Sequence, residues 1–204
     1  RNIGIVAHVD AGKTTLTEQL LYQSGSSRIL GSVDKGTTHT DSLDMEKQRG
    51  ISVKAAETDF TYKGTNVHVI DTPGHIDFSS EVERSIGVLD GAIVVLSSVE
   101  GVQPQTEVYF NALKELNMPS IFFINKLDRI GASPYKTIKD MKKLLTSKLI
   151  PLQLVYEKNN EFIVKNIFDK VNCHKNIITI KEEIFKQLLE DIIDILGNNN
   201  EEIL

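Results

Sequence analysis

Three short strings carry residue types suited to holding phosphates, a metal ion and a nucleobase. They are AHVDAGKT at 7–14, DTPGH at 71–75 and NKLD at 125–128. Each string follows an apolar run that is typical of a buried strand. Loops that follow parallel strands gather at one edge of a sheet. The three strings therefore predict one composite site rather than three separate features.

The first string has the composition of a phosphate-binding loop, because a glycine-rich turn here joins a strand to a helical pattern at 14–21. The backbone N–H groups of the turn and the positive helix N-terminus favour an anion. We expect Lys13 to reach the β- and γ-phosphates and the Thr14 hydroxyl to ligate Mg²⁺. Ala7 replaces the first glycine of the usual pattern. Its backbone must therefore adopt a conformation that a residue with a Cβ allows. The predicted nucleotide-binding residues of this loop are Ala11, Gly12, Lys13, Thr14 and Thr15.

The second string begins where a strand at 65–70 is expected to end. Asp71 can hold Mg²⁺ through a water molecule. Pro73 and Gly74 force a turn that can bring the Gly74 N–H against the γ-phosphate, and His75 stands where a side chain could orient water. We therefore predict Gly74 and His75, together with Lys13, as the catalytic residues.

The third string has the chemistry to select guanine. The Asp128 carboxylate can accept hydrogen bonds from N1–H and the exocyclic amine of guanine, donors that adenine lacks in this pattern, so the discrimination should be strong. Asn125 is expected to tie this loop to the phosphate loop. The aliphatic stem of Lys126 can lie over the face of the base.

Composition places the chain among globular proteins without a membrane span. Its 204 residues are 40% hydrophobic, enough for one core, and the net charge of −5 gives no sign of broad nucleic-acid binding. The single cysteine, Cys173, fits a reducing compartment. We expect a cytoplasmic monomer that does not contact membranes. Because the chain begins at Arg1, we expect a fragment or processed product that lacks downstream domains.

Periodicity, together with the phosphate-binding loop at 7–14, predicts an α/β fold of the P-loop NTPase type, in which a mostly parallel central sheet has one antiparallel edge hairpin and helices on both faces. The hairpin turn is expected at Lys63-Gly64. Strands are predicted near 2–8, 53–62, 65–70, 91–97 and 120–124, and helices near 13–23, 77–89, 104–116 and 134–148.

The remaining segments are less regular. Residues 28–52 form a long non-periodic stretch with a short helix at 42–48, which suits a first switch ordered by γ-phosphate and Mg²⁺. After residue 150 we expect strands at 149–156 and 162–168 and a helix at 181–196. We predict one domain over 1–204, with 150–204 as a subdomain or insert.

The strings together resemble a known family. HVDAGKTTLTE at 8–18, GSVDKGTT at 31–38, DTPGHIDF at 71–78 and NKLDRIGA at 125–132 are similar to the GTP-binding (G) domain of translation-factor GTPases. The first two favour the ribosomal-protection tetracycline-resistance proteins, the Tet(M)/Tet(O) group, over elongation factor G. The resemblance runs from about residue 2 to 132, and loosely to 156.

This resemblance implies a GTPase that converts GTP to GDP and phosphate and is stimulated by the ribosome. His75 would position the attacking water when the sarcin-ricin loop engages it, and Asp10 would help to order the phosphate loop. Ser52 stands where the family usually has the switch threonine, so it would ligate Mg²⁺ beside Thr14 and Asp71. The full-length parent would contact the small subunit and release tetracycline.

Two alternatives remain open. An elongation factor G-like translocase would share these loops and differ only in its downstream domains. A nucleotide-binding module without turnover is suggested by Ser52 and by the lack of a recognisable Ser-Ala guanine loop after 128. The intact phosphate, metal and water-positioning residues argue against this second alternative.

Overall fold

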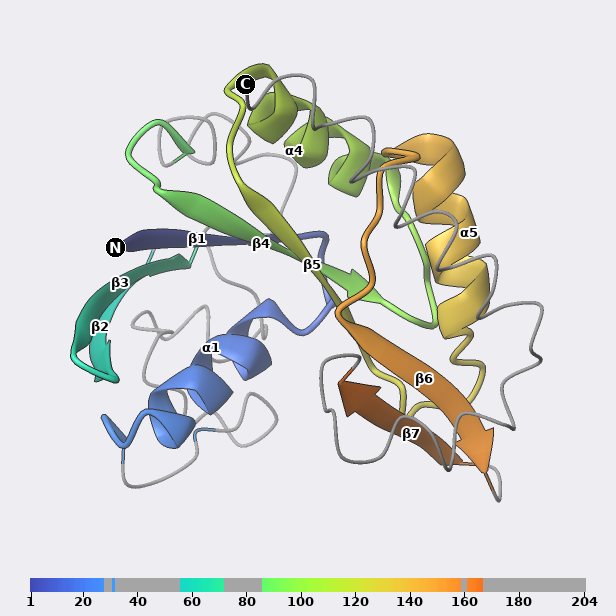
Figure 1. Ribbon diagram of the computed structural model, residues 1–204, viewed down its shortest axis with the longest axis horizontal. Helices are drawn as coiled ribbons and strands as arrows, with labels where there is room; N and C mark the ends of the chain where they lie inside the picture. The colour runs from blue at the N-terminus through green and yellow to red at the C-terminus, as the bar shows by residue number, and fades with distance from the viewer. Residues whose placement is uncertain (28–30, 32–55, 72–85, 159–160, 167–204) are drawn as a thin grey trace, which may run out of the picture. The chain divides into compact units, whose positions relative to one another are not determined.

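The computed structural model describes residues 1–27, 31, 56–71, 86–158 and 161–166. The chain divides into two compact units, Arg1–Asp140 and Met141–Leu204. The described part of the first unit contains a five-stranded sheet in the order β2-β3-β1-β4-β5 (Figure 1). Its strands are β1 (Asn2–Ala7), β2 (Ala56–Tyr62), β3 (Thr65–Asp71), β4 (Gly91–Ser97) and β5 (Ser120–Asn125).

The pairing of the strands confirms the predicted mixed sheet. β1 runs parallel to both β3 and β4, and β4 runs parallel to β5. β2 pairs antiparallel with β3 at the edge of the sheet. Lys63 and Gly64 join these two strands with φ of 48° and 78°. Two successive positive φ angles give the turn a twist that matches that of the flanking strands.

Helices lie on both faces of this sheet, as the sequence predicted (Figure 1). α1 (Lys13–Gln23) packs through Leu16 and Leu20 against a buried cluster that includes Ile5 of β1. Because side chains alternate along a strand, Val6 projects from the opposite face. There α4 (Pro104–Glu115) places Phe110 against Phe122 of β5, with ring centroids 5.1 Å apart.

The residues of α4 explain its position. Pro104 occupies the first turn, where its missing N–H costs nothing. Glu107 in the first turn and Lys114 in the last complement the helix dipole. Its buried residues follow the spacing i, i+3, i+4, i+7 and form one apolar face. They are Thr106, Tyr109, Phe110 and Leu113.

The end of the third described helix, α5 (Pro134–Leu144), corrects the predicted range 134–148. The Thr146 N–H bonds to Met141 O at 3.1 Å, and the Thr146 hydroxyl accepts from the Lys148 N–H at 3.2 Å. These bonds satisfy the backbone outside the helix, so the helix does not continue.

The second unit contains an antiparallel pair, β6 (Gln153–Lys158) and β7 (Glu161–Asn166). The prediction of strands in this region is confirmed, but the first begins at 153 rather than 149. Pro151 lacks the N–H that a ladder requires, which accounts for the later start.

Several predicted elements fall wholly or partly outside the described residues. These are the first switch at 28–52 apart from Gly31, the start of the strand at 53–62, the helix at 181–196 and residues 77–85 of the helix at 77–89. The predicted end of that last helix is wrong, because Ile86 is helical and residues 87–89 form a turn. Gly87 follows Ile86, and glycine favours a helix end. In the part of the chain that is described, no helix is long and apolar enough to cross a membrane.

We expect Leu113→Ala to lower the free energy of unfolding by about 2–5 kcal/mol, because it leaves a cavity under α4. Leu113 is fully buried, whereas Val108 on the same helix is 54% exposed. Val108→Ala is the matched control and should change stability little. Urea denaturation of both variants measures the difference, and equal losses would contradict the assigned face of α4.

Candidate nucleotide-binding site

The carboxyl ends of four parallel strands meet at one edge of the sheet. Asp71 is the last residue of β3, and Ser97 and Asn125 end the neighbouring strands β4 and β5, where they pair directly. β1 ends at Ala7, beside Val95 of β4. The described parts of the three sequence strings therefore converge, as the sequence analysis predicted.

The phosphate loop follows β1 and ends at the first turn of α1. Ala7 lies in the strand and is buried, so the change from glycine requires no special backbone there. Asp10 has φ of 62° and Gly12 has φ of 96°, both in the left-handed region. A non-glycine residue in that region carries a cost that the surrounding structure must offset, and such residues cluster at functional sites.

Asn125 holds the base loop against the phosphate loop. Its Nδ2 donates to the carbonyl oxygen of Ala11 at 3.0 Å, across 114 residues of sequence. A Cβ on Gly12 would collide with this same Nδ2. Gly12 is thus needed for its φ and for the space that it leaves to Asn125.

The start of α1 is suited to an anion. Within α1, which the structure describes in full, no side chain caps the N-terminus and the first turn carries no acidic residue. The N-terminal N–H groups and the helix dipole therefore attract negative charge without competition from a carboxylate in that turn. Thr14 at this end is half-buried, and Thr15 is exposed.

Lys13 and Asp71 form a buried ion pair beneath the loop. The Thr17 hydroxyl lies 3.3 Å from Asp71 Oδ2 and 3.2 Å from the Lys13 carbonyl oxygen. Buried charges of this kind need a partner, because removing one leaves the other uncompensated. Thr17 was not predicted as a site residue, although its place one helical turn after Lys13 is a signal that could have pointed to it.

The donor set at Asp71 and Thr14 fits Mg²⁺. A carboxylate and a hydroxyl are hard oxygen ligands, and Mg²⁺ takes few protein ligands while phosphates and water complete its shell. Among the described residues, no group of three or more His, Cys, Asp or Glu side chains could hold a metal ion. An ion held jointly with a nucleotide phosphate is consistent with this sparse set.

The base loop presents its carboxylate to solvent. The Asp128 side chain is 80% exposed, with Arg129 Nε 3.8 Å from its Oδ2. Lys126 has φ of 62° and a side chain that is 25% exposed. The predicted residues Ser52, Gly74 and His75 lie outside the described residues, so their placement stays a prediction.

Comparisons with known proteins now decide the family. The sequence matches the family described as "Elongation factor Tu GTP binding domain" over residues 1–198. The chain belongs to this family. The match continues past residue 156, where the resemblance in the sequence analysis ended.

Two relatives of this GTP-binding domain are described as tetracycline resistance proteins. The chain is 48% identical over 203 residues to "Tetracycline resistance protein TetP" of Clostridium perfringens, which covers 99% of this chain and 31% of that protein. It is 52% identical over 154 residues to TetO of Campylobacter jejuni, covering 76% of this chain and 24% of that protein. The chain thus spans less than a third of the length of these relatives.

A solved structure supports the fold. The chain resembles the crystal structure of ttk003000868 from Thermus thermophilus, with a TM-score of 0.77 and 31% identity. The likeness covers 82% of this chain and 25% of the Thermus protein. The α/β fold and its mixed sheet therefore match an experimentally determined chain.

One contact beside the predicted site, between His8 and Glu100, went unnoticed in the sequence. His8 in the phosphate loop is 5% exposed, and its Nε2 lies 2.7 Å from Glu100 Oε2. Burial lowers the pKa of His8, while the hydrogen bond and the charge of Glu100 oppose this shift. No local pattern signals this contact, because 92 residues separate the two side chains.

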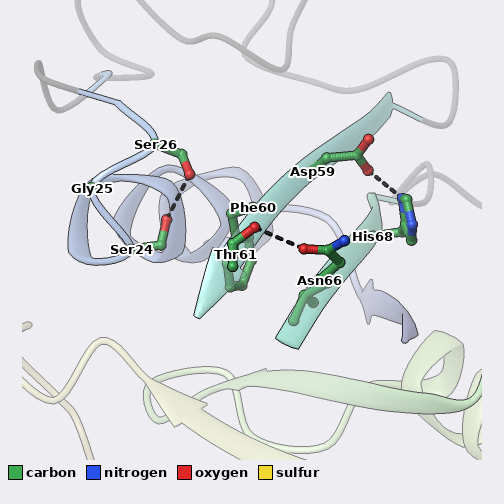
Figure 2. A pocket seen from close by; sticks show the side chains of 9 residues that line it. Ser24, Gly25, Ser26, Asp59, Phe60, Thr61, Asn66 and His68 are labelled. Carbon is green, nitrogen blue, oxygen red and sulfur yellow. Dashed lines mark hydrogen bonds and ion pairs between the residues drawn. The ribbon is translucent and has the colours of Figure 1, made fainter. Parts of the chain in front are cut away.

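A separate pocket of about 490 Å³ lies between the end of α1 and the β2–β3 hairpin. Figure 2 shows Asp59 pointing toward His68 and Thr61 toward Asn66 across the two strands. None of the predicted nucleotide-binding residues lines this pocket. Its lining residues are Ser24, Gly25, Ser26, Asp59, Phe60, Thr61, Asn66, Val67 and His68.

We expect Gly12→Ala to destabilise the domain by about 1–3 kcal/mol and to weaken GDP binding, because strain at φ of 96° adds to the collision with Asn125. Gly25→Ala is the matched control: Gly25 has φ of 77°, and a Cβ there meets nothing within 4 Å. Thermal unfolding and GDP titration of both variants separate the two effects. Equal behaviour would refute the steric role of Gly12.

Proposed function

We propose that this chain is the GTP-hydrolysing domain of a ribosomal-protection protein, and that the intact gene product releases tetracycline from the ribosome. The observation that carries the proposal is the direct bond from Asn125 of the base loop to Ala11 of the phosphate loop. That bond holds the loop that carries the guanine-reading carboxylate against the loop that leads into the anion-binding start of α1. The 48–53% identity to proteins named for tetracycline resistance supports the biological role.

Nucleotide binding exchanges the partners of the buried ion pair. Lys13 turns from Asp71 to the β- and γ-phosphates, whose negative charge replaces that of the carboxylate. Asp71, Thr14 and Ser52 are the residues that would hold Mg²⁺, Asp71 through a water molecule. Each buried charge keeps an opposite partner, so the exchange avoids the cost of an uncompensated charge.

Hydrolysis depends on how the site positions a water molecule and the γ-phosphate. Water attacks the γ-phosphorus, the bond to the β–γ bridging oxygen breaks, and GDP and inorganic phosphate result. Lys13 and the Gly74 N–H stabilise charge on the phosphate oxygens, and His75 orients the water. Bound Mg²⁺ neutralises the charge that develops on the phosphates. Unaided turnover should be slow, and the ribosome is the proposed activator.

Guanine selection belongs to Asp128, whose exposed carboxylate is open to the N1–H and exocyclic amine of the base. We expect Asp128→Asn to weaken GDP binding by about a hundredfold or more, because an amide nitrogen would face the donors of guanine. The same variant should gain affinity for xanthosine diphosphate, whose carbonyl replaces the exocyclic amine.

Asp59→Asn is the control for this variant, since Asp59 carries the same charge on β2 and its side chain is 71% exposed. Fluorescence titration with both nucleotides makes the comparison. Unchanged GDP affinity in Asp128→Asn would remove Asp128 from the base-reading role.

The biological role is tested with the product of the intact gene. Added with GTP to a bacterial translation reaction stalled by tetracycline, it should restore peptide synthesis, and Lys13→Ala should not. Restoration is expected to need hydrolysable GTP, because departure from the ribosome follows hydrolysis. If the product instead replaces elongation factor G in a depleted reaction and leaves the tetracycline block in place, the protein is a translocase.

A further inference from the structure

The loop that follows β4 belongs to none of the three nucleotide-binding strings. It nevertheless lies beside the loops that the first and the third string form. Ser97 ends β4, and the Gly101 N–H bonds back to the Ser97 carbonyl oxygen at 2.8 Å. The turn between them carries one acidic side chain, Glu100. Glu100 contacts both the phosphate loop and the base loop.

The two oxygens of the Glu100 carboxylate serve different loops. Oε2 accepts from His8 Nε2 at 2.7 Å, and Oε1 lies 3.8 Å from Lys126 Nζ. Lys126 directly follows Asn125, which contacts Ala11. The base loop is therefore joined to the phosphate loop twice, once directly through Asn125 and once through Glu100.

The backbone of Glu100 is held by contacts other than the two that its side chain makes. Its N–H lies 3.3 Å from the Ser97 hydroxyl oxygen, and its carbonyl oxygen accepts from Gln103 Nε2 at 2.8 Å. Ser97 is fully buried, and Gln103 is the N-cap residue that directly precedes α4. Because both backbone groups are held, the side chain is directed toward its two partners. This lowers the conformational entropy that is lost in each contact.

His8 leaves the charge of Glu100 available to Lys126. Burial is the main cause that lowers the pKa of His8, so the imidazole is neutral near pH 7. The Thr106 hydroxyl lies 3.3 Å from Nδ1 and can donate to it, which leaves Nε2 to carry the proton that Glu100 accepts. A neutral donor orients the carboxylate without neutralising it.

We propose that Glu100 is a positioning residue for guanine binding, which holds the Lys126 side chain along the base and locks the base loop to the phosphate loop through His8. The proposal rests on the proposed nucleotide function and adds to it a residue outside the three strings. Glu100 touches neither base nor phosphate in this account. It acts through Lys126, whose stem covers the base.

The test is a double-mutant cycle with Glu100→Gln and Lys126→Met, with affinities for GDP and GTP measured by fluorescence titration. Glutamine keeps a carbonyl oxygen for the His8 N–H and loses the charge that attracts Lys126. We expect Glu100→Gln to weaken GDP and GTP by the same factor, roughly threefold to tenfold, as for loss of a partly screened charged contact. In the Lys126→Met background the same change should have almost no effect.

Glu115→Gln is the matched control, because Glu115 is an exposed carboxylate at the end of α4. It should leave both affinities unchanged. Circular dichroism verifies that each variant is folded, and Glu100→Asp, which shortens the reach to Lys126, replaces Glu100→Gln if that variant does not fold.

Each outcome is decisive. An effect of Glu100→Gln that persists in full without the Lys126 ammonium would overturn the proposal, as would a change confined to GTP, which would place Glu100 with the phosphates. If the unaltered protein itself fails to bind GDP, the proposed function fails instead, so the two failures are distinct.

Discussion

One hydrogen bond, from the Asn125 side chain to the Ala11 carbonyl oxygen, fixes how far the base loop stands from the phosphate loop. Both loops start at the carboxyl ends of parallel strands, so the sheet brings them to the same edge but does not set their spacing. The bond does so, and it requires a residue without a Cβ at Gly12. The backbone conformation of the phosphate loop at Gly12 and the position of the base loop therefore depend on each other.

The second determinant of the site is charge. Lys13 and Asp71 are both buried, and each satisfies the other. Such a pair gives weak evidence for stability, because the cost of removing both charges from water is large. It is better understood as a site prepared for a ligand that brings both signs of charge, such as a nucleotide phosphate with its metal ion. The Thr17 hydroxyl beside the pair provides a further polar contact.

The elements that local sequence patterns determine were predicted correctly. The starts of α1 and α4 and the range of β4 follow from glycine, proline and apolar spacing, and the Lys63-Gly64 turn follows from the backbone freedom of glycine. The bond from Asn125 to the phosphate loop was predicted from the NKLD string that contains Asn125. The end of α5 was missed because Thr146 side-chain and backbone bonds stop the helix. The His8–Glu100 contact was missed because only the strand order brings these residues together.

The proposed site at this edge of the sheet would bind guanine nucleotides through three loops at once. The most direct measurement is calorimetric titration of the intact gene product with GDP and with ADP, each with and without Mg²⁺. We expect GDP to bind, Mg²⁺ to strengthen its binding, and ADP to bind at least about a thousandfold more weakly. Equal affinity for the two nucleotides would contradict the role given to the base loop, and no binding of either would contradict the site itself.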